Sequence, residues 1–261
     1  HAVRATNGRW TLLPWSLTLP NYAGDCIALG ACVNGLPGVI HLHCPSVTTV
    51  NESAFWGCTS QIAVHMPAVT TIGMFAFKDC TLLTAVHMLA VNTVGGSAFA
   101  GCTSLMAVRM DAVEDVEEFA FSKCTSLANL HMGAVNTIGR FAFARCTSLT
   151  IVRMDNVEDV EECAFKDCTS LQIVHVRAVQ TIGPFAFKGC TSLTTVHTDA
   201  VKKIAESAFE GCTSLTTADM YTVEPMEIDV SRDHTLLTPV KNGDLVLEGV
   251  ENDADVKGAL A

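Results

Sequence analysis

The protein has 261 residues, of which 49% are hydrophobic and only 16% are charged. Disordered chains combine low hydrophobicity with high charge, so this composition indicates a folded core. Acidic residues outnumber basic ones by 27 to 16, which gives a net charge of −11. We therefore expect no nucleic-acid partner, because phosphate binding requires a basic surface.

The sequence gives no sign of a transmembrane segment. Its longest apolar stretch runs from Cys26 to Ile40 and is interrupted by Asn34 and Pro37. A membrane-spanning helix needs about 20 largely uninterrupted apolar residues. We expect a chain that does not span a membrane. Because the chain begins at His1 rather than Met, the sequence leaves its compartment open.

The first segment, residues 1–38, carries no repeat signature but contains Trp10 and Trp15. The first coil of a solenoid exposes its core, and a capping segment has to cover it. We predict that residues 1–38 form an N-terminal cap. Cys26 and Cys32 lie in this segment, and whether they form a disulfide is left open.

A strict 22-residue repeat dominates residues 39–222 and determines the expected fold. One phenylalanine and one cysteine recur at this spacing in eight successive units; the columns are Phe55, Phe77, Phe99, Phe121, Phe143, Phe165, Phe187, Phe209 and Cys58, Cys80, Cys102, Cys124, Cys146, Cys168, Cys190, Cys212. A single 22-residue coil cannot bury its own apolar side, whereas stacked coils cover one another. The repeat therefore predicts a solenoid with an inward-facing phenylalanine and cysteine in each coil.

Each unit also contains a short alternating segment. Val108 and Met110 alternate with Ala107, Arg109 and Asp111, and this period of two is typical of a half-buried strand. We predict about nine short parallel strands, one per coil. One apolar column of these strands is expected to be buried, namely Val64, Val86, Val108, Leu130, Val152, Val174 and Val196.

These residues carry a family resemblance. The L-x-x-V-x-M strand followed by A-F-x-x-C-T-S-L resembles the leucine-rich repeats of the BspA-like class, over about residues 39–222. The strict 22-residue period, with Val and Met where Leu is usual, departs from that class. The resemblance implies an α/β repeat solenoid, right-handed and curved, with a binding role. It also implies a cell-surface or secreted location, with an intracellular or organellar complex subunit as the alternative.

The last segment, residues 223–261, leaves the repeat. Thr235–Val240 and Leu245–Val250 flank Asn242-Gly243, a strong signal for a hairpin turn. We predict a C-terminal cap hairpin followed by an acidic tail. The alternative that the sequence leaves open is an arm that reaches a partner.

Charged residues also form columns. Glu118, Arg140 and Glu162 are 22 residues apart, so we expect a positive coil between two negative ones on the surface. Such alternation avoids like charges on adjacent rungs.

A patch of apolar and charged residues on the concave sheet is the candidate binding site. Ile151 and Ile173 are expected to be exposed neighbours on adjacent strands, surrounded by charged and imidazole side chains. An exposed apolar pair with a charged rim is typical of a protein interface. The predicted binding residues are Ile151, Arg153, Asp155, Ile173, His175, Arg177, His131 and Arg109.

Histidines of the same strand column suggest an alternative function. His41, His43, His65 and His87 fall on three adjacent rungs, and imidazole is the commonest neutral metal ligand. A metal or small-ligand site is one interpretation of this column. A solvated polar column copied by duplication is the other, and it is the one favoured.

No motif of an enzyme occurs in the sequence; nucleotide-binding loops, the nucleophile elbow and the H-E-x-x-H zinc motif are all missing. We expect no catalytic residues and no cofactor. The leading prediction is a non-enzymatic interaction or scaffold module that binds a protein partner through its concave sheet and terminal arms. It would act as an adhesin-like surface protein or as a subunit of a larger assembly, whose oligomeric state the sequence leaves open.

Overall fold

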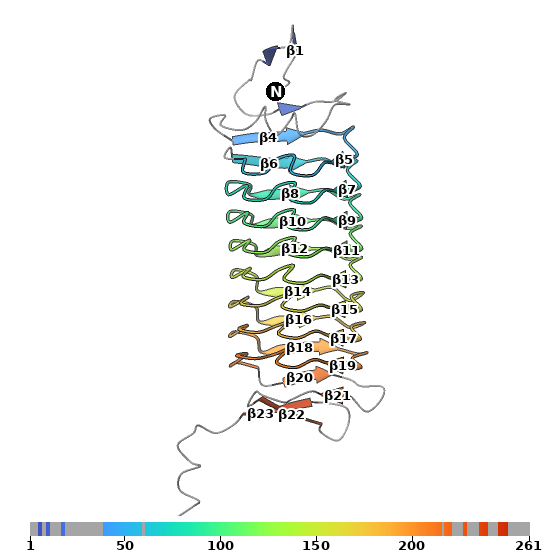
Figure 1. The fold of residues 1–261 in the computed structure, drawn as a ribbon, viewed down its shortest axis with the longest axis vertical. Coiled ribbons are helices and arrows are strands. Elements are labelled where there is room, and N and C mark those ends of the chain that lie inside the picture. Colours follow the sequence, from blue (N-terminus) through green and yellow to red (C-terminus); the bar gives the residue numbers. More distant parts are fainter. Residues whose placement is uncertain are drawn as a thin grey trace, which may run out of the picture.

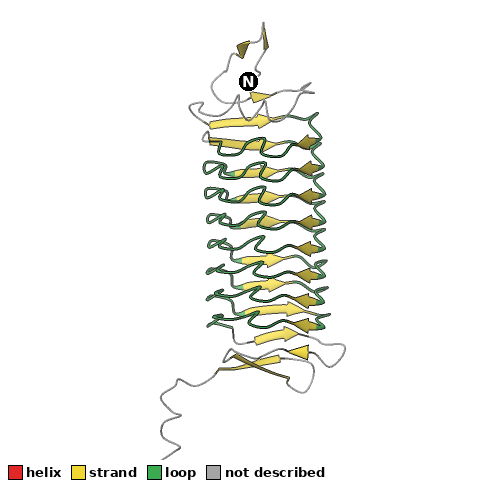
Figure 2. Cartoon of the chain, in the orientation of Figure 1, coloured by secondary structure: helices red, strands yellow, loops and turns green. Residues whose placement is uncertain are grey.

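A computed structural model describes residues 5–6, 9–10, 17–18, 39–58, 61–215, 217–220, 227–228, 235–239 and 245–249. Side chains are described for residues 44–58 and 64–215. Within these residues the chain forms a stack of coils along one axis, as Figure 1 shows. The described part contains strands and turns but no helix (Figure 2).

Nine strands follow the predicted alternating segments and define what we call the strand face. Their bounds are β4 Val39–His43, β6 Gln61–His65, β8 Ala85–His87, β10 Ala107–Arg109, β12 Asn129–His131, β14 Ile151–Arg153, β16 Ile173–His175, β18 Thr195–Thr198 and β20 Thr217–Met220. Neighbouring strands that pair do so in parallel, offset by one repeat, as in Val108 opposite Val86. The predicted solenoid of about nine short parallel strands is confirmed.

A second parallel sheet lies in the return arc of each coil. Its strands are two residues long: β5 Thr49–Val50, β7 Thr71–Ile72, β9 Thr93–Val94, β11 Asp115–Val116, β13 Thr137–Ile138, β15 Asp159–Val160, β17 Thr181–Ile182, β19 Lys203–Ile204 and β21 Glu227–Ile228. All nine strands belong to one uninterrupted sheet. The sequence pattern does not indicate this sheet, because two-residue strands are too short to show alternation.

The core between the two sheets consists of the repeated columns. The phenylalanine rings from Phe55 to Phe209 stack face to face with centroids 4.8 to 5.3 Å apart. The cysteine of each coil lies beside them, and from Cys80 onward its thiol donates to a phenylalanine carbonyl one coil earlier, as Cys80 does to Phe55 at 2.9 Å. Such repeated packing makes each coil depend on its neighbours.

The strand face is divided, whereas the second sheet is not. One six-stranded sheet consists of β3 (Leu17–Thr18), β4, β6, β8, β10 and β12. The strands β14, β16, β18 and β20 belong to another sheet. No strand pairing joins β12 to β14, although β13 and β15 behind them remain paired. Leu130 in β12 was expected to be buried and is only half-buried. That prediction is wrong because β14 does not cover Leu130 from its side of the break.

Strands outside the repeat flank the stack. β22 (Thr235–Pro239) and β23 (Leu245–Gly249) pair in an antiparallel hairpin, and β23 pairs antiparallel with β20. At the other end, β3 pairs with β4 in parallel, and β1 (Ala5–Thr6) pairs with β2 (Arg9–Trp10). The predicted cap boundaries at 1–38 and 223–261 stay predictions, and Cys26 and Cys32 lie outside the described residues.

Candidate functional site: a cleft where the strand face divides

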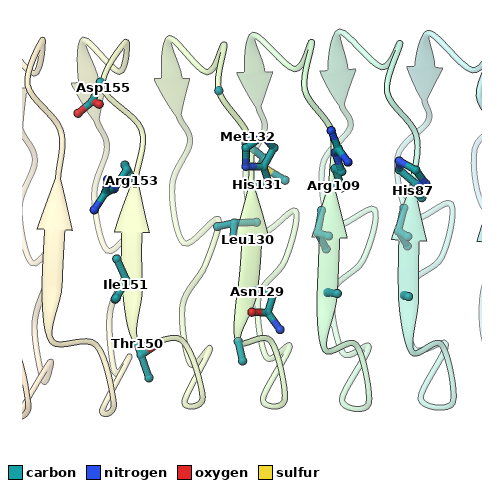
Figure 3. Close-up of a pocket in the computed structure, with 16 residues that line it drawn as sticks. His87, Arg109, Asn129, Leu130, His131, Met132, Thr150, Ile151, Arg153 and Asp155 are labelled. Carbon is teal, nitrogen blue, oxygen red and sulfur yellow. The ribbon is translucent and has the colours of Figure 1, made fainter.

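A cleft of about 840 Å³ opens at the break in the strand face. Figure 3 shows β12 and β14 standing farther apart than the neighbouring strands β8, β10 and β12. The cleft is lined by three consecutive strands on one side and by β14 on the other; its residues include Asn129, Leu130, His131, Met132, Thr150, Ile151, Arg153 and Asp155. Its size lies within the range of about 300–1,000 Å³ that is usual for ligand-binding pockets.

Backbone N–H and C=O groups of β12 and β14 that face the cleft lack the hydrogen bonds that the equivalent groups form in the adjacent coils. In the coils before and after, Met110 N donates to His131 O at 3.0 Å and Met154 N donates to His175 O at 2.9 Å. The corresponding bond from Met132 N to Arg153 O does not occur among the described residues. Both strands therefore present sheet edges inside the molecule, and unpaired edges are ready to accept another strand.

A second row of bonds is missing in the same way. Asn129 N donates to Met106 O at 3.0 Å, but no bond runs from Ile151 N to Ala128 O in the described coils. The missing bonds bracket the cleft at both ends of the strands. Polar backbone groups and apolar side chains thus occur together along it.

Two large apolar side chains lie on either side of the break, beside smaller lining residues such as Ala107 and Ala128. Leu130 is half-buried, and Figure 3 shows it directed toward the space between β12 and β14. Ile151 on the opposite strand is 46% exposed. Together they offer apolar surface to solvent beside the break.

Charged side chains surround this apolar surface. On one side the Asp111 carboxylate accepts from Arg109 at 3.2 Å, and His131 Nε2 lies 3.3 Å from the same carboxylate. On the other side Asp155 lies 3.8 Å from Arg177, so this carboxylate is also paired. Arg153 is exposed and forms no ion pair with any described residue. It is the cation of the rim that is free to bind an acidic group.

The structure brings most of the predicted binding residues together. Ile151 lies opposite Ile173, and Arg153 lies opposite His175, in the register of β14 and β16. Ile151 is exposed as expected, whereas Ile173 is half-buried, so the expected pair of exposed neighbours is formed only in part. Arg109 and His131 lie across the break, on β10 and β12. The repeat pattern does not indicate the cleft itself or the contribution of Leu130 to it. The only sign in the sequence is that Leu130 interrupts a column that is otherwise valine from Val64 to Val196.

The histidines of the alternative prediction form stacked pairs. The His65 and His87 ring centroids are 5.2 Å apart, and those of His175 and His197 are 4.6 Å apart. Among the described side chains no three His, Cys, Asp or Glu residues are grouped so as to hold a metal ion. The side chains of His41 and His43 lie outside the described residues. No arrangement in the described part favours the metal-binding alternative.

The buried cysteines are chemically quiet. Burial raises the pKa of the Cys124 and Cys146 thiols well above the ordinary value, so these groups stay protonated at neutral pH. Burial likewise raises the pKa of Cys163, and both it and Cys44 are buried although they lie outside the repeated cysteine column. A protonated thiol in an apolar core is a poor nucleophile.

Fold and site together define a repeat solenoid of the leucine-rich repeat class. The family model described as "BspA type Leucine rich repeat region (6 copies)" matches residues 48–172 and 172–225, which is more than half of the chain. The chain belongs to this family, and the predicted resemblance is confirmed. Proteins of this family are generally interaction modules that bind proteins, and they are generally non-enzymatic.

Two solved structures resemble the chain. A leucine-rich repeat protein of T. pallidum is 28% identical, with a TM-score of 0.58, covering 64% of this chain and 82% of that one. A leucine-rich cell surface protein of Faecalibacterium prausnitzii is 25% identical, with a TM-score of 0.56, covering 66% of this chain and 58% of that one. A comparison with curated proteins gave no match. The described residues include no helix long and apolar enough to cross a membrane.

Proposed function

We propose that this chain is a non-enzymatic interaction module that binds a protein partner through the strand face around Ile151 and Ile173. The observation that carries the proposal is the 46% exposure of Ile151 beside the cleft, within a rim of Arg109, His131 and Arg153. An apolar centre inside a polar rim is the usual anatomy of a protein interface.

The rigidity of the face supports the same function. Apart from the break, the strands are tied to their neighbours by backbone hydrogen bonds and lie on a continuous buried core. A preorganised surface loses little conformational entropy when a partner binds. The family membership supports protein binding as the general role. The Faecalibacterium relative is described as a cell surface protein, which supports a surface location for this chain as well.

Affinity capture with the purified full chain tests the proposal. The double variant Ile151→Asp and Ile173→Asp places charge at the centre of the patch, and we expect it to lose the proteins that the unchanged chain captures. Trp56→Ala is the matched control, because Trp56 is 53% exposed but lies in a return arc rather than on the strand face. Both variants should keep the thermal unfolding midpoint nearly unchanged. Undiminished capture by the double variant would place the interface elsewhere.

A further inference from the structure

The cleft between β12 and β14 has the chemistry of a site for an extended chain. On one edge lie the N–H of Met132 and the C=O of Ala128, and on the other the C=O of Arg153 and the N–H of Ile151. Equivalent groups are paired between β10 and β12 and between β14 and β16. A peptide in extended conformation satisfies such groups with its own main chain, as in strand addition to an exposed sheet edge.

The fold lets this cleft widen without unfolding. The strands of the continuous second sheet, β13 and β15, remain paired behind the break with Ile138 opposite Val160. An added strand needs about 4.8 Å on each side. Insertion of a strand therefore requires β12 and β14 to separate further, while the paired second sheet holds the two halves together.

The side chains of the cleft select the sequence of the bound segment. Leu130 offers apolar contact on the inward side of the cleft, and Ile151 offers it on the outward side. Both rim carboxylates, Asp111 and Asp155, are already paired with basic residues of the chain. Arg153 has no such partner among the residues that the structure describes, so the unpaired charge at this part of the rim is positive. Arginine binds a carboxylate through charge-assisted hydrogen bonds, which are stronger than neutral ones.

We propose that the cleft between β12 and β14 binds an extended acidic segment of a protein partner. The main chain of this segment pairs with the free edges of the two strands. Because side chains alternate along a strand, apolar side chains of the segment face inward onto Leu130, and the acidic residues between them face outward, where a carboxylate pairs with Arg153. This inference rests on the proposed function, because it specifies which partner chemistry the strand face recognises.

The net charge of −11 works against the binding of an acidic segment. Long-range electrostatics favour a basic ligand for an acidic protein and disfavour an acidic one. Preference for an acidic peptide over a basic peptide of the same length therefore has to come from local contacts. A measured preference for the acidic peptide would therefore indicate local contacts in the cleft rather than an effect of the overall charge.

The test uses the full chain and three synthetic peptides followed by fluorescence anisotropy. The first peptide is Val-Glu-Val-Glu-Val-Glu-Val with blocked ends and a fluorescent label. The second has Lys in place of each Glu, and the third is the acidic peptide with N-methyl groups on alternate peptide bonds. We expect the acidic peptide to bind most tightly. N-methylation should weaken binding by about tenfold, the effect of losing one or two backbone hydrogen bonds.

Two matched variants locate the carboxylate contact. Arg153→Gln should weaken binding of the acidic peptide by about tenfold, because it removes a charge-assisted hydrogen bond. Lys123→Gln removes the same charge from an exposed residue outside the cleft and should leave binding unchanged. Hydrogen exchange should show that the acidic peptide protects the amides of Met132 and Ile151.

Any of three results overturns the proposal: no binding of the acidic peptide, equal binding of the acidic and basic peptides, or an undiminished affinity of Arg153→Gln. Failure here does not decide the proposed function. If the peptide fails to bind but Ile151→Asp with Ile173→Asp still abolishes partner capture, the strand face is the interface and the cleft is not the acidic-segment site. If capture also survives the double variant, the proposed function fails on its own evidence.

Discussion

The two sheets of this solenoid are built from the same coils, yet one is continuous and the other is divided. The second sheet runs through all nine of its strands, from β5 to β21. The strand face separates between β12 and β14. Figure 1 shows both sheets along the same stack. The coils are therefore in register throughout, and the break is a local property of one face.

The comparison shows where the repeat is constrained and where it is free to vary. Two core columns recur without exception, the phenylalanine column from Phe55 to Phe209 and the cysteine column from Cys58 to Cys212. Strand-face positions vary from coil to coil, with Ala107, Asn129 and Ile151 following one another in a single column. A uniform core holds the solenoid together while the variable face acquires a site.

The largest loss of stability should come from disrupting the phenylalanine column, which runs without interruption through the core. Phe121 is fully buried and stacks between Phe99 and Phe143 at 5.0 and 5.3 Å. We expect Phe121→Ala to reduce the free energy of unfolding by about 3–5 kcal/mol, measured by chemical denaturation. Met106→Ala is the control, since Met106 is 51% exposed and should cost far less. Equal losses in both variants would show that the phenylalanine column does not form the core.

Repetition made the core predictable and the site only partly so. Phe121 and Cys124 were placed correctly because eight copies fix which side of the coil each residue occupies. The neighbouring pair Ile151 and Ile173 also followed from the register of the repeat. The break between β12 and β14 did not follow from the repeat, because Leu and Val are both apolar and give the same alternating pattern. Whether a strand accepts the larger side chain depends on lateral packing, which the pattern does not encode.

The second-largest change in stability is expected on the divided strand face, where Leu130 replaces the valine of the other coils from Val64 to Val196. Valine is branched at Cβ and suits a crowded pleated surface, whereas the γ-branch of leucine needs more lateral room. We expect Leu130→Val to let β12 pair with β14, protecting the amides of Met132 and Ile151 from hydrogen exchange. The new backbone bonds should outweigh the lost methylene and raise the free energy of unfolding by about 1–2 kcal/mol.

Leu127→Val is the matched control for this prediction. Leu127 is fully buried in the same coil, so the change removes a methylene without allowing new strand pairing. It should lower the free energy of unfolding by roughly 1 kcal/mol and leave the exchange of Met132 and Ile151 as it was. Unaltered exchange in Leu130→Val would mean that the leucine is not the cause of the break.

A smaller effect is expected on the surface of the return arcs. The predicted charge column is formed in part: Arg140 pairs with Glu162 at 2.8 Å, while no ion pair to Glu118 occurs among the described residues. Exposed pairs contribute about 0–1 kcal/mol. Arg140→Glu should lower the free energy of unfolding by up to about 1 kcal/mol at low salt, and less at high salt.

The control for the charge column is Lys123→Glu. It changes the net charge by the same amount at an exposed residue that has no ion pair within the described part of the chain. It should therefore destabilise the protein less than Arg140→Glu at low salt. Equal effects of the two variants would assign the loss to net charge rather than to the pair.

The smallest effect is a dependence of stability on pH at His175 in β16. Burial lowers the pKa of His175, and the neighbouring His197, Arg153 and Arg177 lower it further, while Asp155 opposes them. A lowered pKa means that the folded state binds fewer protons than the unfolded state, in which histidine titrates near about 6.5. The free energy of unfolding should therefore fall as the pH drops below about 6.5, through the range in which only the unfolded state is protonated.

His175→Gln should reduce this loss, measured as the change in denaturant midpoint between about pH 7.5 and about pH 5. His131→Gln, at an exposed histidine across the break, should leave the loss in place. An acid-induced loss that is the same in His175→Gln as in the unchanged protein would show that the His175–His197 stack does not contribute to it.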